Sequence, residues 1–463
     1  MRIHVRSGRR AGGDDAVMGT PGDKSIAHRW LILAATATGP SRLAHLPPSL
    51  DVRSTASCLS RVTVKARPAL DLWASNASSW VEGGGSTWNE TSREGPREPS
   101  TRPLEVEGEG RATLVESRTD LDCGNSGTSM RLLAGLLSSA PFSCRLVGDT
   151  SLSARPMERV AEPLRRMGAR IDTTEGHPPL LVSGGSLHGI EQMLEVPTAQ
   201  VKGALLLAGI AADGETLVTE PVATRDHTER ALAALGAPVR REGTTVGVSR
   251  FQHEGFDGSV PGDVSSAAFL IGAAALGGRA LSIEGVGLNP SRTRYLDVLT
   301  RMGVRTETVI TDEQLGEPVG RIELRAEAEL HGTTIDEGEL PLVIDEVPLL
   351  AVLAAHAEGE TWFLGAHELR LKETDRLTRI AEGIRSLGGH AAAEADDLVI
   401  AGGGLRGGVA SSGGDHRLAM AFAVAGVGAE GVCEVRGVEA AEVSFPGFVE
   451  ALREAGASVE VVE

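Results

Sequence analysis

The stretch LRRMGARI at residues 164–171 has the pattern of a helix that ends in a glycine and leads into a short strand. Its apolar residues are spaced three and four apart, Gly168 stands where a helix end favours positive φ, and a β-type segment follows. The pattern recurs as LAALGAPV at 232–239, LTRMGVRT at 299–306, IRSLGGHA at 384–391 and LREAGASV at 452–459. The chain is therefore predicted to be an α/β protein built from repeated units.

The glycines of the five copies stand 67 to 85 residues apart. This interval is too long for a solenoid and suits a βαβ-type unit. A sixth, irregular copy is CLSRVTVK at 58–65, where Val62 takes the place of glycine. Because 463 residues exceed what one hydrophobic core usually organises, we expect two lobes. Six units in two lobes predict three units in each.

One segment, from about residue 66 to residue 110, lacks the repeat pattern. It is rich in Ser, Gly, Pro, Asn and Glu and contains Trp73, Trp80 and Trp88. Turn-forming residues without periodicity are typical of an exposed irregular connection, although a functional lid is the alternative. The Gly-rich run AGGGLRGG at 401–408 fits no phosphate-loop pattern and predicts turns between strands.

Composition excludes several classes of protein. The formal charge of −18 argues against nucleic-acid binding, which needs Lys and Arg clustered over a surface. Four scattered cysteines without a CxxC pair predict reduced core thiols rather than disulfides or a zinc site. Residues 1–10 lack the apolar core of a secretory signal, and no segment approaches the ~20 apolar residues that span a bilayer. We expect a cytoplasmic protein that does not enter a membrane.

The segment PGDKSIAHR at 21–29 is typical of an anion-binding helix start. An apolar helix pattern follows from Ile26, so Ser25 would lie where free backbone N–H groups and the helix dipole favour an anion. Lys24 and Arg29 add positive charge beside it. An ordinary capped surface helix is the alternative interpretation.

Other segments repeat this polar entry into an apolar helix. CGNSGTSMR at 123–131 supplies small residues that let the backbone approach a phosphate or carboxylate closely. Arg155 precedes a helix expected to begin at Pro156. Thr198, Gln200 and Lys202 supply donors at the start of a further helix. Each segment alone is more typical of a helix cap, and their recurrence favours a site. Four further segments with a polar entry into a helix are TRDHTER at 224–230, IDEVPLLA at 344–351, LRLKETDR at 369–376 and GDHRLAM at 414–420.

The chain resembles the 5-enolpyruvylshikimate-3-phosphate (EPSP) synthase family in nine strings that follow the family's order: PGDKSIAHR, CGNSGTSMR, SLSARPM, AQVKGALLLAG, RDHTER, VPGDVSSAAF, IDEVPLLA, LRLKETDR and DHRLAMAFA. The resemblance implies a two-lobed inside-out α/β barrel with three βαβαββ-like repeats in each lobe. It places a discontinuous lobe I at 1–19 and 261–463 and lobe II at 20–260, with 66–110 as an irregular surface insertion in lobe II.

The resemblance also implies the reaction and the residues that bind its substrates. The enolpyruvyl group of phosphoenolpyruvate would pass to the 5-hydroxyl of shikimate-3-phosphate, with release of phosphate, in the shikimate pathway. Shikimate-3-phosphate would be bound by Lys24, Ser25, Arg29, Thr198, Ala199, Gln200, Arg225, Asp345 and Lys372. Phosphoenolpyruvate would be bound by Lys24, Asn125, Gly127, Arg155, Gln200, Arg376 and Arg417.

Three of these residues are expected to be catalytic. We hypothesise that Asp345 is the base toward the hydroxyl, that Glu373 protonates carbon, and that Lys24 assists near the leaving phosphate. No metal or cofactor is expected, because fixed cations already neutralise the substrates. Those cations repel one another in an empty cleft, so we expect the lobes to close when both anions bind. The expected form is a monomer.

Two alternatives remain open. Enolpyruvyl transferases that act on a sugar nucleotide usually carry a loop cysteine and an Asn where this chain has Ser25. A non-catalytic scaffold would be expected to have lost charged residues that are present here, such as Lys24 and Asp345. The chain departs from the family's pattern in Thr198, where Ser is more common, and in Val443, where some members carry Lys. Gly127 suggests sensitivity to glyphosate.

Overall fold

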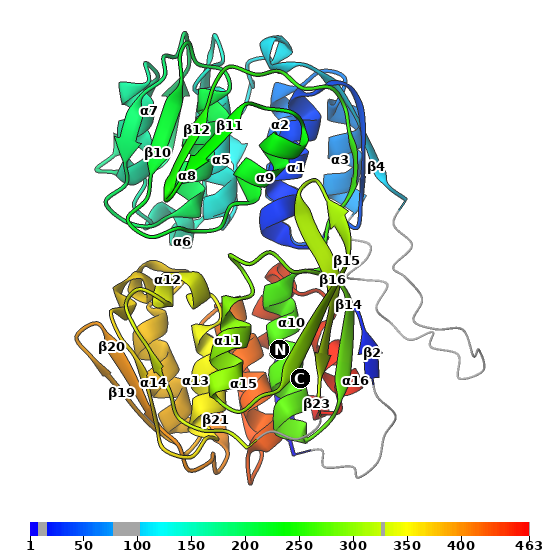
Figure 1. Ribbon diagram of the computed structural model, residues 1–463, viewed down its shortest axis with the longest axis vertical. Helices are drawn as coiled ribbons and strands as arrows, with labels where there is room; N and C mark the ends of the chain where they lie inside the picture. Colours follow the sequence, from blue (N-terminus) through cyan, green and yellow to red (C-terminus); the bar gives the residue numbers. More distant parts are fainter. Residues whose placement is uncertain (8–15, 77–101, 326–328, 463) are drawn as a thin grey trace. The chain divides into compact units, whose positions relative to one another are not determined.

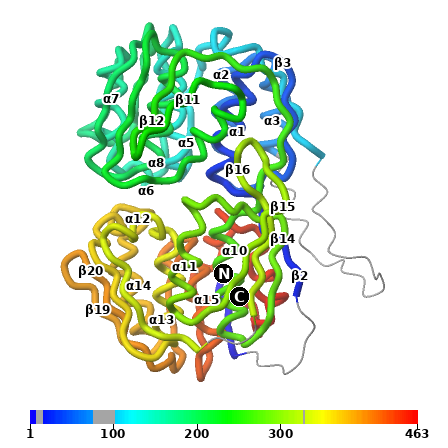
Figure 2. Tube along the Cα trace, in the orientation of Figure 1, coloured from blue at the N-terminus to red at the C-terminus, as the bar shows by residue number. Residues whose placement is uncertain are grey.

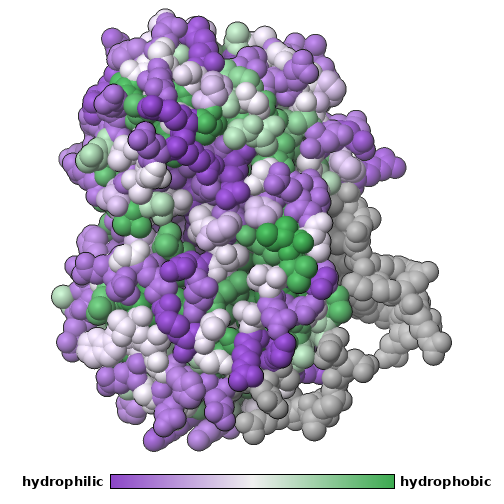
Figure 3. All heavy atoms as spheres, viewed as in Figure 1, coloured by the Kyte–Doolittle hydropathy of each residue, from purple (hydrophilic) through white to green (hydrophobic). Residues whose placement is uncertain are grey.

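The computed structural model describes residues 1–7, 16–76, 102–325 and 329–462. The chain divides into two compact units (Figure 1). Hydrophilic residues cover most of the face that each unit presents in Figure 3. In the described ranges, no helix is both long and apolar enough to cross a membrane. Unit 1 comprises Met1–Pro21, Gly262–Asp312 and Pro318–Glu463, and unit 2 comprises Gly22–Pro261 and Glu313–Glu317.

The short segment 313–317 lies in unit 2, whereas the predicted boundaries placed it in lobe I. Its partners explain the assignment. His227 Nδ1 lies 2.8 Å from Glu317 Oε1, and Arg230 Nη1 donates to the carbonyl of Gly316 at 2.9 Å. The segment is the tip of a β-hairpin, and these contacts with His227 and Arg230 place it in unit 2.

Three four-stranded sheets make up the described part of unit 1. The first has the order β21 (Gly408–Ser411), β22 (Cys433–Arg436), β1 (Arg2–Arg6) and β23 (Ser458–Val462). The second has the order β15 (Thr306–Gln314), β16 (Glu317–Leu324), β14 (Leu281–Gly287) and β2 (Ala16–Met18). The third has the order β17 (Thr334–Ile335), β18 (Glu360–Phe363), β20 (Asp397–Ala401) and β19 (His390–Glu394). Strands β1 and β23 pair antiparallel, so the first and last strands lie side by side (Figure 2).

Three further sheets belong to the described part of unit 2. One has three strands, in the order β13 (Asp257–Ser259), β3 (Thr38–Ala44) and β4 (Leu104–Glu109). Another has the order β5 (Leu121–Asp122), β6 (Ser143–Val147), β8 (His177–Ser183) and β7 (Arg170–Thr174). The last has the order β11 (Val239–Glu242), β12 (Thr245–Val248), β10 (Thr216–Thr219) and β9 (Glu191–Met193).

All six of these sheets share one pairing scheme. A central strand pairs parallel with the strand at one edge and antiparallel with its other neighbour. In unit 2 the central strands are β3, β6 and β10. In unit 1 they are β22, β14 and β18. A pairing scheme that recurs along one chain is what a repeated supersecondary unit produces. The mixed α/β class is confirmed.

The interior of each unit is built from helices that are buried on nearly every side. In unit 2, α5 (Gly127–Leu137) contacts both α1 (Lys24–Thr36) and α8 (Ala199–Gly209). In unit 1, α10 (Val264–Gly277), α13 (Val347–Ala355) and α15 (His416–Gly428) contact one another. A helix that is apolar all round is stable only when protein surrounds it. Three predicted site residues, Lys24, Gly127 and Ala199, are the first residues of α1, α5 and α8.

The repeat glycines occupy the position that the sequence predicts. Five helices end just before them: α7 (Glu158–Arg166), α9 (His227–Ala234), α11 (Arg294–Arg301), α14 (Arg376–Ser386) and α16 (Phe448–Glu454). A strand of the same repeat follows each glycine. The φ angles of Gly168, Gly236, Gly303, Gly388 and Gly456 lie between 82° and 112°. A residue with a Cβ atom is disfavoured there, so the helix–glycine–strand prediction is confirmed.

The predicted irregular insertion at 66–110 is partly regular. After α2 (Leu50–Val62) comes α3 (Arg67–Asn76), whose Leu70 is fully buried. Strand β4 alternates buried and exposed residues and pairs with β3. Leu104 and Val106 thus gave a period-two signal that the polar composition of the segment obscured. Residues 77–101, including Trp80 and Trp88, lie outside the described residues.

Shorter elements complete the two units. All four cysteines are free and buried, as predicted. Helix α7 begins at Glu158 with Met157 as its N-cap, so Pro156 precedes the cap rather than starting the helix as expected. AGGGLRGG joins β20 to β21, as predicted. The short helices are α6 (Thr150–Ser153), α12 (Leu340–Val343), η1 (Arg111–Thr113), η2 (Ala366–Leu371) and η3 (Val438–Val443).

Candidate active site

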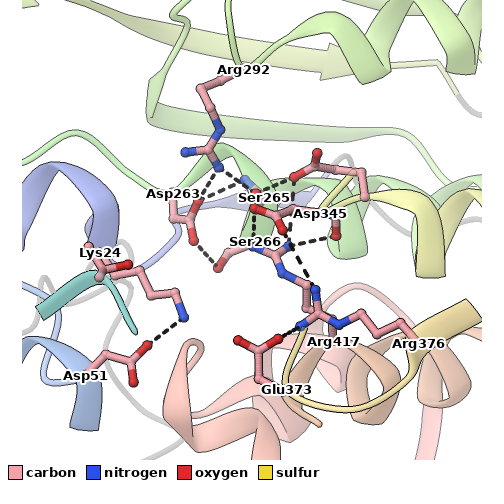
Figure 4. A network of polar contacts seen from close by, with 12 residues as sticks. Lys24, Asp51, Asp263, Ser265, Ser266, Arg292, Asp345, Glu373, Arg376 and Arg417 are labelled. Carbon is pink, nitrogen blue, oxygen red and sulfur yellow. Dashed lines mark hydrogen bonds and ion pairs between the residues drawn. The ribbon is translucent and has the colours of Figure 1, made fainter. Parts of the chain in front are cut away.

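The start of α1 carries the first predicted site residues in unit 2. Asp23 caps the helix by accepting a hydrogen bond from Ile26 N at 3.0 Å. Lys24 and Ser25 are therefore the first two helical residues, as the PGDKS string predicts. The ammonium of Lys24 lies 2.9 Å from Asp51 Oδ2, and both side chains are mostly buried (Figure 4). Sequence reasoning missed Asp51, because its partner lies 27 residues away and no local pattern connects the two.

Arg29 joins three helices of unit 2. Its Nε donates to Thr228 Oγ1 at 2.7 Å and its Nη1 to the carbonyl of Ser25 at 2.8 Å. Its Nη2 donates to the carbonyl of Ala199 at 3.5 Å. Burial lowers the pKa of Arg29 to about 10, and the positive charge of Arg225 acts in the same direction against nearby carboxylates. The guanidinium thus fixes the backbone of two predicted binding residues, Ser25 and Ala199.

A buried chain of hydrogen bonds connects α1 to α2 and α5. His28 Nδ1 lies 2.7 Å from Thr55 Oγ1, which lies 2.6 Å from Ser129 Oγ. Ser129 Oγ in turn donates to Ser126 Oγ at 2.7 Å. Burial lowers the pKa of His28 to about 3, so the imidazole is neutral at physiological pH. The chain therefore fixes the relative positions of two predicted helix starts without adding charge.

Just before α5, Asn125 connects the predicted residue Arg155 to the carboxylate of Asp149. Asn125 Oδ1 accepts from Arg155 Nη2 at 2.6 Å, and Asn125 Nδ2 donates to Asp149 Oδ2 at 2.7 Å. A Cβ atom added to Gly127 would lie 2.9 Å from Arg131 Nη1 and 3.3 Å from Arg155 Nη1. The glycine is therefore what allows two guanidinium groups to approach the first turn of the helix.

Arg131 is a site residue that the sequence prediction left out. Its Nη1 donates to Gln200 Oε1, and its Nη2 donates to the carbonyl of Pro156 at 3.3 Å. Gln200 Nε2 donates to Thr128 Oγ1 at 2.9 Å. The available signal was spacing, since Arg131 follows Gly127 by four residues and so lies on the same helix face. Arg131 and Gln200 thus link the start of α5 to the start of α8.

The loop before α9 holds Arg225. Asp226, the N-cap of this helix, accepts from Arg230 Nε at 2.8 Å and from Arg241 Nη1 at 3.0 Å. Thr198 is the N-cap of α8, and its side chain makes no capping hydrogen bond. Thr198 and Arg225 are both partly exposed. Their side chains are thus positioned by well-fixed backbone rather than by burial.

In unit 1, the predicted catalytic carboxylates surround Arg376. Its Nη2 lies 2.5 Å from Glu373 Oε2, and its Nη1 lies 3.7 Å from Asp345 Oδ1 (Figure 4). Its Nε lies 2.7 Å from Asp415 Oδ2. Burial acts to lower the pKa of Arg376, but the charges of Asp415 and Glu373 outweigh it and raise the pKa. The base and the acid predicted from the sequence therefore contact one buried cation.

Arg417 is the second arginine of this cluster. Its Nη1 donates to the carbonyl of Asp345 at 2.9 Å, and its Nη2 lies 3.4 Å from Asp345 Oδ2. Its Nη1 also lies 3.8 Å from Glu346 Oε1. Asp415 caps α15 by accepting from Arg417 N at 2.9 Å. The cluster thus connects the starts of α13, α14 and α15.

A buried network behind Asp345 was not predicted. Ser265 Oγ donates to Glu346 Oε1, and Arg292 Nη2 donates to Ser265 Oγ at 2.6 Å. The same nitrogen lies 3.6 Å from Asp263 Oδ1. The local signal was the string PGDVSS, which repeats the PGDKSI of unit 2 and so marks a helix start of the same kind.

The structure thus groups most predicted residues, within one unit at a time. Contacts connect Asp345, Glu373, Arg376 and Arg417 in unit 1. Lys372 is half-buried in the loop between η2 and α14. In unit 2, contacts of Arg29 connect Ser25 and Ala199, and contacts of Asn125, Arg131 and Gly127 connect Arg155 and Gln200.

Comparisons with known proteins agree with one another. A profile of the family described as EPSP synthase (3-phosphoshikimate 1-carboxyvinyltransferase) matches residues 15–76 and 98–452. A relative named 3-phosphoshikimate 1-carboxyvinyltransferase from Acidithiobacillus ferrooxidans is 43% identical over 464 residues, which cover 99% of each chain. One of the same name from Halorhodospira halophila is 46% identical over 448 residues, covering 95% of this chain and 94% of the relative.

Solved structures give the same result. The chain aligns with EPSP synthase from Acinetobacter baumannii with a TM-score of 0.82 and 37% identity, over 100% of both chains. It aligns with the enolpyruvyl transferase NikO from Streptomyces tendae with a TM-score of 0.71 and 20% identity, over 99% of this chain and 98% of that one. The second match concerns the fold alone.

Proposed function

The chain belongs to the EPSP synthase family, and we propose that the charged clusters of its two units bind and activate the two anionic substrates of that reaction. Its activity is that of the family: it transfers the enolpyruvyl group of phosphoenolpyruvate to the 5-hydroxyl of shikimate-3-phosphate and releases phosphate, in the shikimate pathway. What we propose is the division of labour among its residues.

The observation that carries the proposal is the shared contact of Asp345 and Glu373 with the buried guanidinium of Arg376, at 3.7 Å and 2.5 Å. Two carboxylates that contact one fixed cation keep a fixed separation, which the addition of a hydroxyl and a proton across one double bond requires. In this proposal Asp345 removes the proton from the 5-hydroxyl. The guanidiniums of Arg376 and Arg417 favour the ionised carboxylate that a base must be.

Glu373 has the opposite task, since it must deliver a proton to the methylene carbon of phosphoenolpyruvate. In the structure its carboxylate is paired with Arg376, which favours the ionised form. We propose that the carboxylate of phosphoenolpyruvate binds Arg417 and takes over Arg376 Nη2 from Glu373, because arginine forks match a carboxylate. Asp345 keeps its own contacts with Arg376 Nη1 and Arg417 Nη2 and so stays ionised. Glu373 then loses its counter-charge and binds a proton more readily. The substrate itself would thus prepare the acid.

The residues of unit 2 bind the phosphate groups in this proposal. Lys24, at the first position of α1, assists the departure of phosphate from the tetrahedral intermediate. Asn125, Gly127, Arg155 and Gln200 bind phosphoenolpyruvate. Shikimate-3-phosphate is bound by Lys24, Ser25, Arg29, Thr198, Ala199, Gln200 and Arg225 from unit 2, and by Asp345 and Lys372 from unit 1. The contacts of Arg29 with the Ser25 and Ala199 carbonyls support this grouping.

The test replaces each carboxylate by its amide. We expect Asp345→Asn and Glu373→Gln each to lower kcat by about 10²–10⁴-fold, the usual contribution of general acid–base catalysis, with shikimate-3-phosphate binding still measurable by calorimetry. Asp297→Asn, on an exposed carboxylate of α11, is the control and should turn over normally. Near-normal turnover of either amide variant would remove that residue from the catalytic roles.

The proposal also covers the barrel architecture, the lobes and their closure, the absence of nucleic-acid binding, the location and the oligomeric state. We propose an inside-out α/β barrel in which each sheet with its helices is one repeat, supported by the pairing scheme common to the six described sheets. The lobes would be 1–19 with 261–463, and 20–260, except that residues 313–317 belong with the second, and they would close on the substrates. The charge of −18 supports the absence of nucleic-acid binding, and the four free thiols support a reducing, cytoplasmic location. A monomer is the proposed form.

A further inference from the structure

Helix α8 contains a lysine that is completely enclosed by unit 2. Lys202 is 2% exposed, and its neighbours on the helix, Val201 and Ala204 among them, are buried apolar residues. The sequence suggested a donor at the helix entry, whereas the ammonium lies inside the unit. An unpaired ammonium in such a place is very unfavourable, so its partners determine what it does.

Two buried glutamates are those partners. Lys202 Nζ lies 2.6 Å from Glu220 Oε2 and 2.8 Å from Glu229 Oε1, and all three side chains are 2% exposed. Burial acts to lower the pKa of Lys202, but the charges of Glu229 and Glu220 outweigh it and raise the pKa. The lysine is therefore charged, and it ties α8 both to the end of β10 and to α9.

Glu220 continues the connection toward a predicted binding residue. Its Oε1 accepts from Thr224 Oγ1, and its Oε2 accepts from Thr224 N at 3.2 Å. Thr224 immediately precedes Arg225. On the other side of Arg225, Asp226 is held by two arginines at 2.8 Å and 3.0 Å. The backbone that presents Arg225 is thus fixed on both sides, and on one side by the lysine of α8.

The other end of the connection is the first turn of α8. Lys202 N donates to the carbonyl of Thr198 at 3.1 Å, so the lysine belongs to the same turn as Thr198 and Gln200. Beside it, a Cβ atom added to Gly203 would lie 2.8 Å from Thr228 Oγ1 of α9. This close approach leaves little freedom between the two helices. A change at Lys202 is therefore transmitted to the loop rather than absorbed.

We propose that Lys202, Glu220 and Glu229 form a buried clamp that positions Arg225 relative to Thr198 and Gln200 for binding shikimate-3-phosphate. Lys202 is a positioning residue, since it reaches the substrate only through Glu220, Thr224 and Arg225. The inference rests on the proposed role of Arg225. Replacing a buried ion pair by apolar residues is often neutral for stability, so the role of the clamp should appear in substrate binding.

The first test uses Thr224, whose change leaves no buried charge unpaired. Thr224→Val keeps the shape and removes the hydroxyl that Glu220 binds, whereas Thr224→Ser keeps the hydroxyl. We expect the valine variant to raise KM for shikimate-3-phosphate about tenfold with kcat nearly unchanged, since small misplacements of binding groups have large effects. The serine variant should behave like the unaltered protein. Equal KM values for the two variants would overturn the clamp.

The second test is a double-mutant cycle on the full chain. Lys202→Met should raise KM for shikimate-3-phosphate, with little effect on KM for phosphoenolpyruvate. Because Lys202 acts through Arg225, it should add little in an Arg225→Ala background, whereas independent effects would multiply. Leu207→Ala, a buried truncation in the same helix, controls for lost stability and should leave KM unchanged. Multiplying effects, or a change in stability alone, would overturn the proposal.

Failure of the clamp and failure of the proposed function give different results. If Arg225→Ala alone leaves KM for shikimate-3-phosphate unchanged, the role proposed for Arg225 is wrong. If Arg225→Ala raises KM but Thr224→Val and Lys202→Met do not, Arg225 binds the substrate and the clamp is wrong. Should Lys202→Met fail to fold, the comparison of Thr224→Val with Thr224→Ser decides the question.

Discussion

Helices α1 and α10 follow the same three residues and are used differently. Pro-Gly-Asp at 21–23 precedes α1 in the string PGDKSIAHR, and Pro-Gly-Asp at 261–263 precedes α10 in PGDVSSAAF. In both, an Asp caps the helix: Asp23 accepts from Ile26 N, and Asp263 accepts from Ser265 N. Both helices are buried along most of their length. The starting string and the apolar pattern therefore specify the same local structure twice.

The two strings differ at four aligned positions, one of which is Ile26 against Ser266. Where α1 has Lys24, α10 has the buried Val264, and where α1 has Arg29, α10 has Phe269. His28 corresponds to Ala268. Arg29 binds the carbonyls of Ser25 and Ala199, whereas Phe269 packs edge-on against Phe448 with ring centroids 6.5 Å apart. The same position of the repeat can therefore bind neighbouring helices through hydrogen bonds, as Arg29 does, or through apolar packing, as Phe269 does. The hydrogen-bonded version occurs in the helix that carries proposed substrate-binding residues.

The largest effect is expected when Lys24 of α1 is replaced by valine, the residue that α10 has at the same position. Lys24→Val should fold, because Val264 occupies the same helical position in unit 1. It should lower kcat/KM by at least about 10²-fold, since a fixed cation beside a leaving phosphate contributes strongly. Phosphate release under steady-state conditions measures the change. Val264→Ala is the control, and turnover of Lys24→Val close to that control would remove Lys24 from the reaction.

Arg29 offers a second test of the polar connection. Arg29→Met keeps an apolar stem but removes the donors to Thr228 Oγ1 and to the carbonyls of Ser25 and Ala199. We expect KM for shikimate-3-phosphate to rise about tenfold or more, because the loss of a charged hydrogen-bonding group leaves its partners unsatisfied. Phe269→Leu in α10 is the control for lost packing. A fall in thermal stability without a change in KM would show that Arg29 serves the fold alone.

Local chemistry explains how much of the fold could be predicted. Gly168 and the four later repeat glycines predict positive φ angles, which the structure has, and Asp23 and Asp415 are the N-caps of α1 and α15. Each of these features depends on residues within one turn of one another. The apolar runs after them predict central helices for the same reason. Strand β4 escaped notice because its period-two signal spans only six residues in a polar segment.

Long-range pairing explains what could not be predicted. Asp51 lies 27 residues from Lys24, Asp415 lies 39 residues from Arg376, and the partners of Lys202 lie 18 and 27 residues away. Glu373, three residues from Arg376, is the local exception. No spacing rule relates the distant residues, since only the packing of separate repeats brings them together. The resemblance to a family supplied the names of substrate-binding residues, but not of the residues that hold them. Glu220 is therefore a finding of the structure, whereas the spacing of four residues between Gly127 and Arg131 was a usable signal.

Replacing one buried helix glycine of each unit by alanine should have a smaller effect on catalysis than the changes above, and the effect should differ between Gly127 of unit 2 and Gly272 of unit 1. A Cβ atom at Gly127 would lie 2.9 Å from the guanidinium of Arg131, whereas one at Gly272 of α10 would meet the flexible end of Leu349 at 2.6 Å. Gly127→Ala should raise KM for phosphoenolpyruvate several-fold, about tenfold at most, by displacing the arginines. Gly272→Ala should change thermal stability and leave KM as it is. Equal kinetic effects would break the contrast.

The smallest expected effect concerns His28, which α10 replaces by Ala268. Burial lowers the pKa of His28 from 6.5 to about 3 in the folded protein. Below pH 6.5 the unfolded chain binds a proton that the folded chain does not, so the stability that depends on neutral His28 is present above that pH and is lost as the pH falls toward 3.

Between pH 7.5 and pH 5 this difference amounts to about 2 kcal/mol in the free energy of unfolding, from 1.36 kcal/mol per unit of pKa difference. Urea unfolding of the unaltered protein and of His28→Ala at several pH values measures this difference. His28→Ala should be less stable at pH 7.5, because Thr55 loses one of its two hydrogen-bond partners, yet its stability should fall less between pH 7.5 and pH 5. If both proteins lose the same free energy over that range, the acid sensitivity lies elsewhere in the chain, and α1 and α10 do not differ in this respect.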